Sequence, residues 1–434
     1  MSPAGPRRVV VTGLGVVACC GIGTNAFFEG ICGPAPEGER RVTAFDPSQW
    51  FDLKAARRAD RFQQFSVAAA QMALDDAGDV GADPARAGVL LGTGVGGLET
   101  LQQQITVLVE KGPRRVSPYL VPMMMSNAGA AAVSMRFGWR GPCETVVTAC
   151  AAGTQAIGAA ARVIASGRCD AMISGGAEAA MAEIGIAAFS NMTALSSSGV
   201  SRPFDRRRDG FVIAEGGAAL VLEESERAIA RGAHIYAEVL GSGSTADAYH
   251  ITAPAPGGSG ALSCMELALE DAGLTPADVG HINAHGTSTP LNDLAEAEAI
   301  EKLFGTAGPP VTSIKGVTGH SLGAAGAIEA VAVALTIERG IIPPTVGLEE
   351  LDPDIHLDIV TGVPRAFKGG AVLSNSFGFG GHNGSLVLAG FDGSGGSGTP
   401  RHRASNSGSS GGSGTPRHRA SNSGSSGVPT SDPS

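Results

Sequence analysis

The stretch ETVVTACAAGTQAIGAAARVIASG, residues 144–167, changes from one backbone pattern to another within a few positions. Residues 144–148 are mostly β-branched, as in a strand, whereas residues 151–166 are rich in alanine with the apolar spacing of a helix. The stretch therefore predicts a strand that runs directly into a helix, with Cys150 at the helix start. Backbone N–H groups and the helix dipole favour the reactive thiolate at such a position. The alternative is a cysteine that only packs, because free thiols are among the most buried side chains.

The same alternation of strand and helix extends to both sides of this stretch. Before residue 235, strands are expected at 9–12, 88–92, 146–148, 171–174 and 218–223, with helices at 62–77 and 151–166. After residue 235 the scheme restarts, with segments at 235–241, 260–272, 281–284, 293–303, 325–338 and 371–375. The repetition predicts a duplicated α/β architecture with a mostly parallel sheet. The functional site is expected between the halves, where loops from the strand ends meet.

Composition narrows the class of protein. The chain has 434 residues, of which 43% are hydrophobic and 17% charged, and its formal net charge is −10. A protein with this negative net charge is not expected to bind mainly nucleic acid or an anionic membrane, because both bind to positively charged protein surfaces. The seven cysteines lack the spacing of zinc sites, which predicts free thiols in a reducing compartment.

The apolar run VVVTGLGVVACC near the N-terminus superficially resembles a secretion signal. Thr12, Gly13 and Gly15 interrupt it, so it is better interpreted as a strand and turn of a folded domain. No other segment reaches the 18 or so apolar residues that cross a bilayer. We therefore expect no membrane association and a cytoplasmic location.

From Asp392 onward the composition changes abruptly. The segment GGSGTPRHRASNSGSS occurs twice in tandem, at 395–410 and 411–426, with almost no apolar residue. Such a segment cannot offset the entropy of ordering, so residues 392–434 are predicted to be a disordered tail.

Two glycine patterns, at residues 13–18 and 92–97, allow an NAD-dependent oxidoreductase as one hypothesis. The dinucleotide fingerprint also needs an acidic residue about 20 positions on, at the end of the next strand. Glu29 and Glu110 lie instead in helix-like or loop contexts. Nucleotide binding is therefore the weaker interpretation.

Three later stretches place polar groups in loops rich in small residues: NAHGTSTPLND (283–293), SIKGVTGHSLGAAGAIEA (313–330) and SNSFGFGGHNGSLVL (374–388). Each follows or ends a strand-like run, and glycines there let the backbone approach a ligand closely. His285, Lys315 and His320 form with Cys150 a candidate constellation of imidazole, ammonium and thiol. No two of these residues have tight metal-ligand spacing, so no metal site is expected.

The ordered motifs TACAAG, HGTST, KGVTGH and NSFGFGGHNGS resemble those of the β-ketoacyl-acyl carrier protein synthases, over residues 7–391. The resemblance is to the elongating type II enzymes of fatty acid synthesis and the ketosynthases of type II polyketide systems. It implies the thiolase fold, in which two βαβαβαββ halves form five αβαβα layers. Residues 1–240 would be the half with the nucleophile, residues 241–391 the half with the His/Lys loops, and residues 392–434 the tail.

The resemblance also implies an acyltransferase mechanism. Cys150 would take an acyl chain from a carrier-protein thioester, because a thiolate exchanges thioesters with little loss of free energy. A malonyl carrier protein would then lose CO2, with His285 and His320 donating hydrogen bonds to the developing oxyanion. The carbanion would attack the acyl-Cys150, whose oxyanion would rest on the N–H groups of Cys150 and Phe379. For this mechanism, the thiol must lie within about 8 Å of both histidines.

Further residues receive roles through the same resemblance. Lys315 is expected to pair with Glu329, Thr287 and Thr289 to hold the pantetheine arm, and Phe379 to act as a mobile gate. Asp293 and Asn383 would support the site. The acyl pocket would include Val95, Leu120 and Phe189, with Leu120 reaching across a dimer interface. Lys54, Arg57 and Arg58 match the basic stretch on which the acidic carrier protein docks.

No cofactor is expected, since the substrates travel on the phosphopantetheine of the carrier protein. The partners would be that carrier protein and a second subunit, either an identical chain or one similar to a chain-length factor. Fatty acid and polyketide synthesis both stay open. A non-catalytic chain-length or scaffold subunit is the alternative within the family, and the presence of Cys150 with both histidines argues against it.

Overall fold

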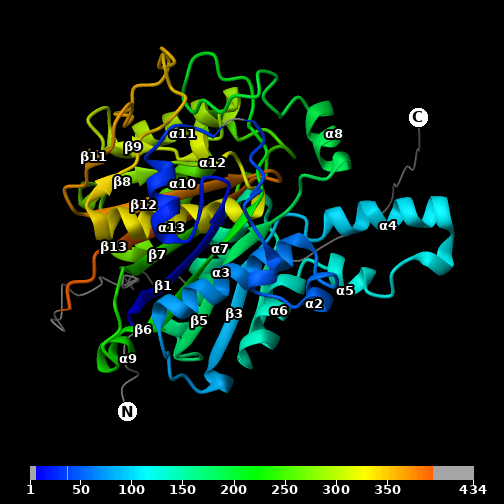
Figure 1. The fold of residues 1–434 in the computed structure, drawn as a ribbon. Coiled ribbons are helices and arrows are strands. Elements are labelled where there is room, and N and C mark those ends of the chain that lie inside the picture. The colour runs from blue at the N-terminus through cyan, green and yellow to red at the C-terminus, as the bar shows by residue number, and fades with distance from the viewer. Residues whose placement is uncertain (1–5, 37, 394–434) are drawn as a thin grey trace, which may run out of the picture. The chain divides into compact units, whose positions relative to one another are not determined.

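The computed structural model describes residues 6–36 and 38–393, which form one compact unit (Figure 1). Its first half contains β1 (Val9–Ala18), β2 (Gly21–Ile22), β3 (Ala87–Gly92), β4 (Cys143–Val146), β5 (Ala171–Glu178) and β6 (Gly216–Glu224). Its second half contains β7 (Ala237–Ala246), β8 (Val279–Asn283), β9 (Val311–Thr312), β12 (Ala371–Gly378) and β13 (His382–Ala389), and a small separate sheet contains β10 (Ile341–Ile342) and β11 (Arg365–Ala366).

The helices alternate with these strands along the chain. They are α1 (Thr24–Ile31), α2 (Leu53–Ala56), α3 (Arg61–Ala77), α4 (Leu98–Lys111), α5 (Leu120–Met124), α6 (Ala128–Phe137), α7 (Ala152–Ala165), α8 (Glu183–Asn191), α9 (Ser225–Ala230), α10 (Ser259–Ala272), α11 (Pro290–Phe304), α12 (Lys315–Thr318) and α13 (Ala325–Arg339). Two 3₁₀ turns, Ala149–Ala151 and Leu322–Ala324, directly precede α7 and α13.

The two halves repeat one strand order. The first sheet runs β4-β3-β5-β6-β1 and the second runs β9-β8-β12-β13-β7, so strands of equal rank occupy equal places. The sheets meet through β1 and β7, which share only two residue pairs, Val10 with Glu238 and Val11 with Ala237. The duplication predicted from the sequence is therefore present in the strand order itself.

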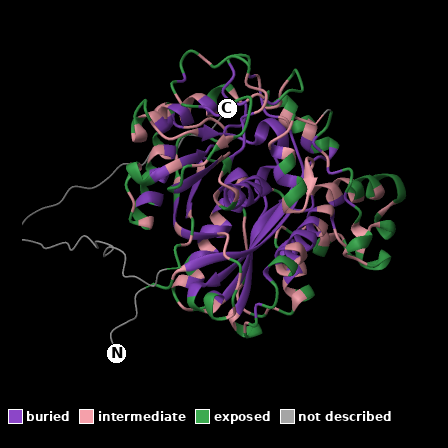
Figure 2. Cartoon of the chain, turned by 60° about the vertical axis from the view of Figure 1, so that its left-hand side comes forward, coloured by how far each residue is buried: buried purple, intermediate pink, exposed green. Residues whose placement is uncertain are grey.

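The layers follow from which helices contact which strands. Helix α3 packs on β1 and β6, and α10 packs on β7 and β13, so these helices cover the outer faces. Helices α7 and α13 contact strands of both sheets and each other, and therefore fill the central layer (Figure 1). Figure 2 shows buried residues concentrated in the strands and the central helices. The resulting order αβαβα is the predicted thiolase fold.

The central layer works because alanines and glycines bring backbones together. In α13, the residues from Ala325 to Thr336 are all buried, and Gly153 of α7 touches this helix directly. A Cβ on Gly153 would lie 2.8 Å from the backbone N of Ala327, closer than real Cβ atoms approach. Small residues therefore allow the two helices to pack closely between the sheets.

The strand predicted at residues 9–12 is longer than expected and leaves no turn at Gly13 and Gly15. It also leaves no loop at residues 13–18 for a nucleotide, which was already the weaker interpretation. Strand β1 continues through both glycines to Ala18, with a register shift between Val11 and Gly13. A Cβ on Gly13 would lie 2.1 Å from the carbonyl oxygen of Ala73, and one on Gly15 would lie 2.0 Å from that of Ala69. These glycines let α3 lie directly on the strand, which sequence spacing alone does not distinguish from a turn.

The expectation of a mostly parallel sheet is also wrong. Strand β3 is parallel to β4 and β5, and β8 is parallel to β9 and β12, but β6 and β13 run antiparallel to both of their neighbours. Strands buried on both faces have continuous apolar runs in either direction, so their composition does not reveal orientation.

The predicted division at residues 240 and 241 falls within β7, the first strand of the second half, and stays a prediction. Apart from its first two residues, the tail predicted at 392–434 lies outside the described residues. Among the helices of the described part, none has both the length and the apolar character needed to cross a membrane.

Candidate active site

Cys150 lies in the 3₁₀ turn between β4 and α7, close to the helix start predicted for it. The residue before it, Ala149, has a φ of 48°, a conformation that costs an alanine about 1–3 kcal/mol and clusters at functional sites. Gly378 of β12 backs onto this turn, since a Cβ there would lie 3.0 Å from the backbone N of Cys150. The second half of the chain thus supports the turn that presents the thiol.

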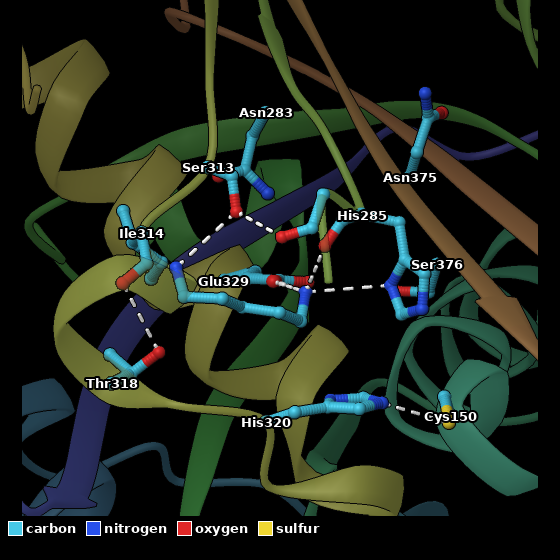
Figure 3. Close-up of polar contacts among 12 residues, drawn as sticks. Cys150, Asn283, His285, Ser313, Ile314, Thr318, His320, Glu329, Asn375 and Ser376 are labelled. Atoms are coloured by element: carbon cyan, nitrogen blue, oxygen red, sulfur yellow. Dashed lines mark hydrogen bonds and ion pairs between the residues drawn. The ribbon is translucent and has the colours of Figure 1, made fainter. Parts of the chain in front are cut away.

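The thiol and the two histidines of the later motifs come together (Figure 3). The sulfur of Cys150 lies 3.0 Å from Nε2 of His320. The rings of His285 and His320 lie 5.3 Å apart, nearly perpendicular, and the sulfur and one nitrogen of each ring all lie within 4.8 Å of one another. The three residues therefore meet the distance that the predicted mechanism requires.

The protonation of the thiol differs from the expectation at a helix start. Burial raises the pKa of Cys150 to about 12, against the opposing effects of the Lys315 charge and the backbone N–H of Phe379. The substrate-free thiol is therefore neutral at pH 7, and the helix start does not by itself hold a thiolate. The sulfur needs a proton acceptor as it reacts, and Nε2 of His320 is within hydrogen-bond distance.

Both histidines are neutral as well. Burial, followed by the charge of Lys315, holds the pKa of His285 and of His320 well below the usual range. Aromatic edges complete their surroundings: the ring of Phe211 lies 5.2 Å from that of His320, and the ring of Phe377 lies 5.9 Å from that of His285. A neutral imidazole has one N–H donor and one acceptor nitrogen, so each ring can donate one hydrogen bond and accept another without carrying charge in a dry site.

Lys315 is the cation of the site, and its predicted contact with Glu329 is present. Its ammonium also donates to the carbonyl oxygen of His285 at 2.6 Å and to Nδ1 of the same residue at 3.4 Å (Figure 3). An ammonium has no lone pair, so Nδ1 accepts and the hydrogen of the neutral His285 ring lies on Nε2. Lys315 thereby sets the tautomer of His285.

Two carboxylates of α11 hold the HGTST loop in place by accepting hydrogen bonds from backbone N–H groups. Asp293, predicted as a supporting residue, accepts from the backbone N–H groups of Phe204 and Ser288 at 2.9 and 3.1 Å. Glu296, one turn further along α11, accepts from the N–H groups of His285 and Gly286, both at 2.8 Å. The position of His285 thus depends on a residue that the sequence analysis did not name.

Two threonines, Thr287 and Thr289, and the hairpin loop Phe379–Gly381 lie beside the reactive groups. The hydroxyls of Thr287 and Thr289 lie 2.9 Å apart. Gly380 and Gly381 have φ values of 84° and 72°, which favour glycine and allow the tight loop between β12 and β13. Asn383 donates to Asp247 at 2.7 Å and so ties this hairpin to the segment after β7.

A cavity of 550 Å³ contains these groups. Of the predicted residues, its lining includes Cys150, His285, His320, Thr287, Thr289, Phe379 and Asn383. Phe189 packs near this cavity, with its ring 5.5 Å from that of Phe211, whereas Val95 is 44% exposed and Leu120 begins the half-buried helix α5. Their role in an acyl pocket stays a prediction.

The three predicted docking residues, Lys54, Arg57 and Arg58, are exposed in and directly after α2. The Arg58 guanidinium lies 4.4 Å from the ring centre of Tyr119. The docking role itself stays a prediction.

Sequence reasoning missed Glu178 and Glu296, two fully buried carboxylates next to the reactive groups. Burial raises the pKa of each to about 7, although several N–H groups donate to them. The spacing of Glu296 from Asp293, three residues apart on a helix that follows the HGTST loop, was a usable signal. Glu178 ends an apolar strand, and nothing in the local pattern distinguishes it.

Comparison with known proteins agrees with this geometry. The family model "Beta-ketoacyl synthase, N-terminal domain" matches residues 32–228, and the corresponding C-terminal domain matches residues 236–349. The chain is 46% identical over 408 residues to 3-oxoacyl-[acyl-carrier-protein] synthase 2 of Synechocystis sp., which covers 88% of this chain and 98% of the relative.

Two solved structures are similar over 89% of this chain and their full length. One is the ishigamide ketosynthase/chain length factor, with a TM-score of 0.84 and 35% identity. The other, with a TM-score of 0.81 and 34% identity, is a type II polyketide acyl-carrier protein in complex with its ketosynthase bound to the hexaketide. The predicted fold, acyltransferase class and family resemblance are thus confirmed, and the chain belongs to the β-ketoacyl synthase family.

Proposed function

We propose that Cys150 accepts an acyl chain from a carrier protein and that His285 and His320 then promote decarboxylative condensation with malonyl-carrier protein. The observation that carries this proposal is the approach of the Cys150 sulfur to 3.0 Å from Nε2 of His320, with His285 beside them in one cavity. A nucleophile next to a neutral base, with a second imidazole facing the same point, fits a reaction in which thioesters are attacked and enolates formed.

In the first half-reaction the thiol attacks the carbonyl of the acyl thioester. The S–H proton passes to Nε2 of His320, the sulfur–carbonyl bond forms, and the carrier thiolate leaves and takes the proton. The N–H groups of Cys150 and Phe379 stabilise the intermediate oxyanion; both favour negative charge on the sulfur in the free site. The raised pKa of Cys150 makes this proton transfer necessary.

In the second half-reaction the malonyl carboxylate leaves as CO2, and its electron pair passes into the thioester as an enolate. The N–H of His285 at Nε2, whose tautomer Lys315 sets, donates a hydrogen bond to the enolate oxygen. His320 donates a second one when its ring hydrogen lies on Nε2 rather than on Nδ1. The enolate carbon attacks the acyl-Cys150 carbonyl, and the 3-oxoacyl product stays on the second carrier. CO2 leaves uncharged, so the negative charge of the malonyl carboxylate ends on the released sulfur, which takes up one proton from solvent and becomes the thiol again.

These steps need no redox or prosthetic group, so we propose a reaction without a cofactor. Among the described residues, the Cys150 sulfur and one nitrogen each of His285 and His320 lie within 4.8 Å of one another. Thiolate and imidazole groups in this arrangement could also bind a divalent metal ion. A bound metal would occupy the nucleophile and the base together. We therefore propose that the cluster serves catalysis as free side chains.

We propose two kinds of partner. A carrier protein is supported by the exposed Lys54, Arg57 and Arg58, since related structures include a carrier protein bound to its ketosynthase. A second subunit is supported by exposed apolar side chains on α4 and α6, including Val109 at 80% and Met135 at 77% exposure, and by the unpaired edge of β4. An identical chain or a chain-length factor could cover this surface. The cytoplasmic location stays a prediction, with which the seven free cysteines agree.

Fatty acid and polyketide elongation stay the two candidate pathways. The similarity to a 3-oxoacyl-[acyl-carrier-protein] synthase 2 at 46% identity favours elongation on a carrier protein in general. The ketosynthase/chain length factor at 35% identity supports the polyketide alternative. Intact mass of carrier proteins that co-purify from the source organism, with the acyl groups they hold, distinguishes the two.

The test uses the purified chain with acyl-carrier and malonyl-carrier proteins. We expect a mass increase of one acyl group on Cys150 with the first carrier alone, and a 3-oxoacyl carrier with CO2 after the second is added. A chain that shows neither product, and whose Cys150 is not alkylated preferentially by iodoacetamide, would instead be a scaffold subunit. Saturable NADPH binding by fluorescence would favour the oxidoreductase hypothesis.

A further inference from the structure

Glu178 is a buried carboxylate that none of the steps above uses. It is the last residue of β5, and its side chain is fully buried. It lies at the carboxyl end of this strand, the same end of the sheet at which the turn after β4 presents the thiol. Its charge acts on Cys150, since it is among the groups that raise the pKa of that thiol. A carboxylate that disfavours the thiolate needs another reason to be there.

Its hydrogen bonds supply that reason. Oε1 accepts from the Thr93 hydroxyl at 3.1 Å and from the N–H of Val95 at 3.4 Å. Oε2 accepts from the N–H of Gly94 at 2.5 Å and from the N–H of Gly323 at 3.1 Å. Thr93, Gly94 and Val95 belong to the loop after β3, in the first half, whereas Gly323 belongs to the turn before α13, in the second.

The two backbones meet too closely for side chains. A Cβ on Gly323 would lie 2.2 Å from the backbone N of Gly94, and a Cβ on Gly94 would lie 2.7 Å from Oε2 of Glu178. The N–H groups of Gly94 and Gly323 donate to the same oxygen, so the carboxylate is the acceptor that satisfies both backbones where they meet. The contact is therefore specific to two glycines and one acceptor.

The turn held by Gly323 shapes the reaction site. Leu322 has a φ of 47°, a strained conformation for a leucine, and its side chain packs in the same cluster as Cys150 and lines the cavity. Only Ser321 separates Leu322 from His320. A shift of this turn would move the residues that face the sulfur on the second half.

We propose that Glu178 is a positioning residue for the condensation: it ties the Thr93–Val95 loop to the Leu322–Ala324 turn and so holds the His320 segment against Cys150. This inference rests on the proposed function, because it assumes that His320 and Cys150 act together. The carboxylate of Glu178 then has two opposite effects. Its hydrogen bonds to both loops favour the reaction, while its negative charge disfavours the Cys150 thiolate.

Two conservative variants separate the effects. Glu178→Gln keeps an oxygen for Gly94 and Gly323 and can turn its NH2 group toward the Thr93 hydroxyl; it has no charge and gives up only the long contact of 3.4 Å from the N–H of Val95. Glu178→Asp keeps the charge but is one methylene too short to reach both loops. The readouts are the alkylation rate of Cys150 with iodoacetamide at pH 8 and the kcat and KM of condensation with malonyl-carrier protein.

For Glu178→Gln we expect alkylation to accelerate about 3–10-fold, because a buried negative charge near the sulfur is removed, with condensation within about threefold of the unchanged chain. For Glu178→Asp we expect alkylation within about twofold and a kcat about 10–100-fold lower at constant KM, the loss typical of a misplacement near 1 Å.

The matched control is Glu223→Gln, at the opposite end of the sheet, where the carboxylate pairs with Arg231. It should lower the melting temperature without changing either rate. If Glu178→Gln loses as much condensation as Glu178→Asp, or if the Asp variant condenses like the unchanged chain, Glu178 is not a positioning residue. Failure of the unchanged chain to form acyl-Cys150 would instead overturn the proposed function.

Discussion

The loops at the ends of equivalent strands in the two halves carry very different side chains. After the third-ranked strand, the first half has Cys150 before α7, whereas the second half has Lys315 and His320 before α13. After the second-ranked strand, the first half has the glycine loop around Gly94, and the second half has the HGTST loop with His285. One backbone plan therefore presents a lone nucleophile from one side and a charged, hydrogen-bonded cluster from the other.

The difference follows from what each task requires. A nucleophile needs one atom, a clear approach and a nearby base, so a single thiol in a strained turn is enough. Handling an enolate in a dry cavity requires oriented donors whose tautomers are set, so the second half has two histidines, one lysine and the carboxylates behind them. The duplicated fold brings both sets to the same edge of the paired sheets.

The strongest way to separate the halves is Cys150→Ala. Condensation should fall by roughly 10⁵-fold or more, as it does when nucleophiles are removed from other enzymes. The second half keeps its histidines in this variant, so decarboxylation of malonyl-carrier protein should continue, measured as acetyl-carrier protein by mass spectrometry. The unchanged chain without an acyl donor is the reference. Loss of decarboxylation together with condensation would show that the halves do not divide the chemistry.

The complementary change is His285→Ala in the second half. It removes a donor to the enolate oxygen, so decarboxylation should fall about 100-fold to 1,000-fold, as for other oxyanion donors. Transfer of the acyl chain to Cys150 should stay within about threefold, because His320 is the residue next to the sulfur. Single-turnover acylation followed by intact mass checks this. A parallel loss of acylation would contradict the division.

The extent to which the sequence predicted this arrangement differs between the halves. The second half was predicted well, because His285, Lys315 and His320 stand in loops of distinctive composition after recognisable strands. The contact of Lys315 with Glu329 is fourteen residues apart in sequence and followed from the family resemblance. Asp293 marked the helix face on which Glu296 also lies.

The first half was predicted less completely, for physical reasons. Gly13 and Gly15 were interpreted as a turn, yet they lie in a strand because a helix packs directly on them. The thiolate expected at Cys150 depends on exposure of the turn, and burial raises its pKa to about 12 instead. Glu178 accepts from residues 85 and 145 positions away in sequence, and contacts at such separations leave no local pattern.

Each half contains a buried glutamate whose pKa is raised, so the stability of both halves should depend on pH in the same way. Burial raises the pKa of Glu178 in the first half and of Glu296 in the second to about 7, from an ordinary 4.5. The folded state therefore binds these protons more tightly than the unfolded state. Their stabilising effect is fully present below about pH 4.5 and is lost as the pH rises through about 7.

Glu178→Gln and Glu296→Gln should each remove this loss, so between pH 5.5 and pH 8 each variant should gain about 1–3 kcal/mol in free energy of unfolding relative to the unchanged chain. Urea unfolding at several pH values measures it, and the difference between variant and unchanged chain removes the effect of other groups. The exposed Glu226 of α9 provides a surface control, Glu226→Gln, measured in the same way. A flat difference for either buried glutamate would mean that its carboxyl is ionised in the folded chain throughout this range.

The smallest expected effect concerns carrier-protein docking, for which we expect the two half-reactions to use the same surface of the first half. Both carriers are proposed to reach the cavity over the basic residues Lys54 and Arg57 of the first half, so charge reversal at Lys54 should raise KM alike for acyl-carrier and malonyl-carrier protein. Exposed charge pairs contribute about 0.2–1 kcal/mol, which predicts a change of about 1.5-fold to fivefold at low salt and less at 0.5 M salt. Lys368→Glu, exposed before β12 at the opposite end of that strand from the Phe379–Gly381 loop, is the matched control. An effect of Lys54→Glu on only one carrier would mean that the two half-reactions use different entrances, and the division of labour between the halves would then extend from the chemistry to the surface.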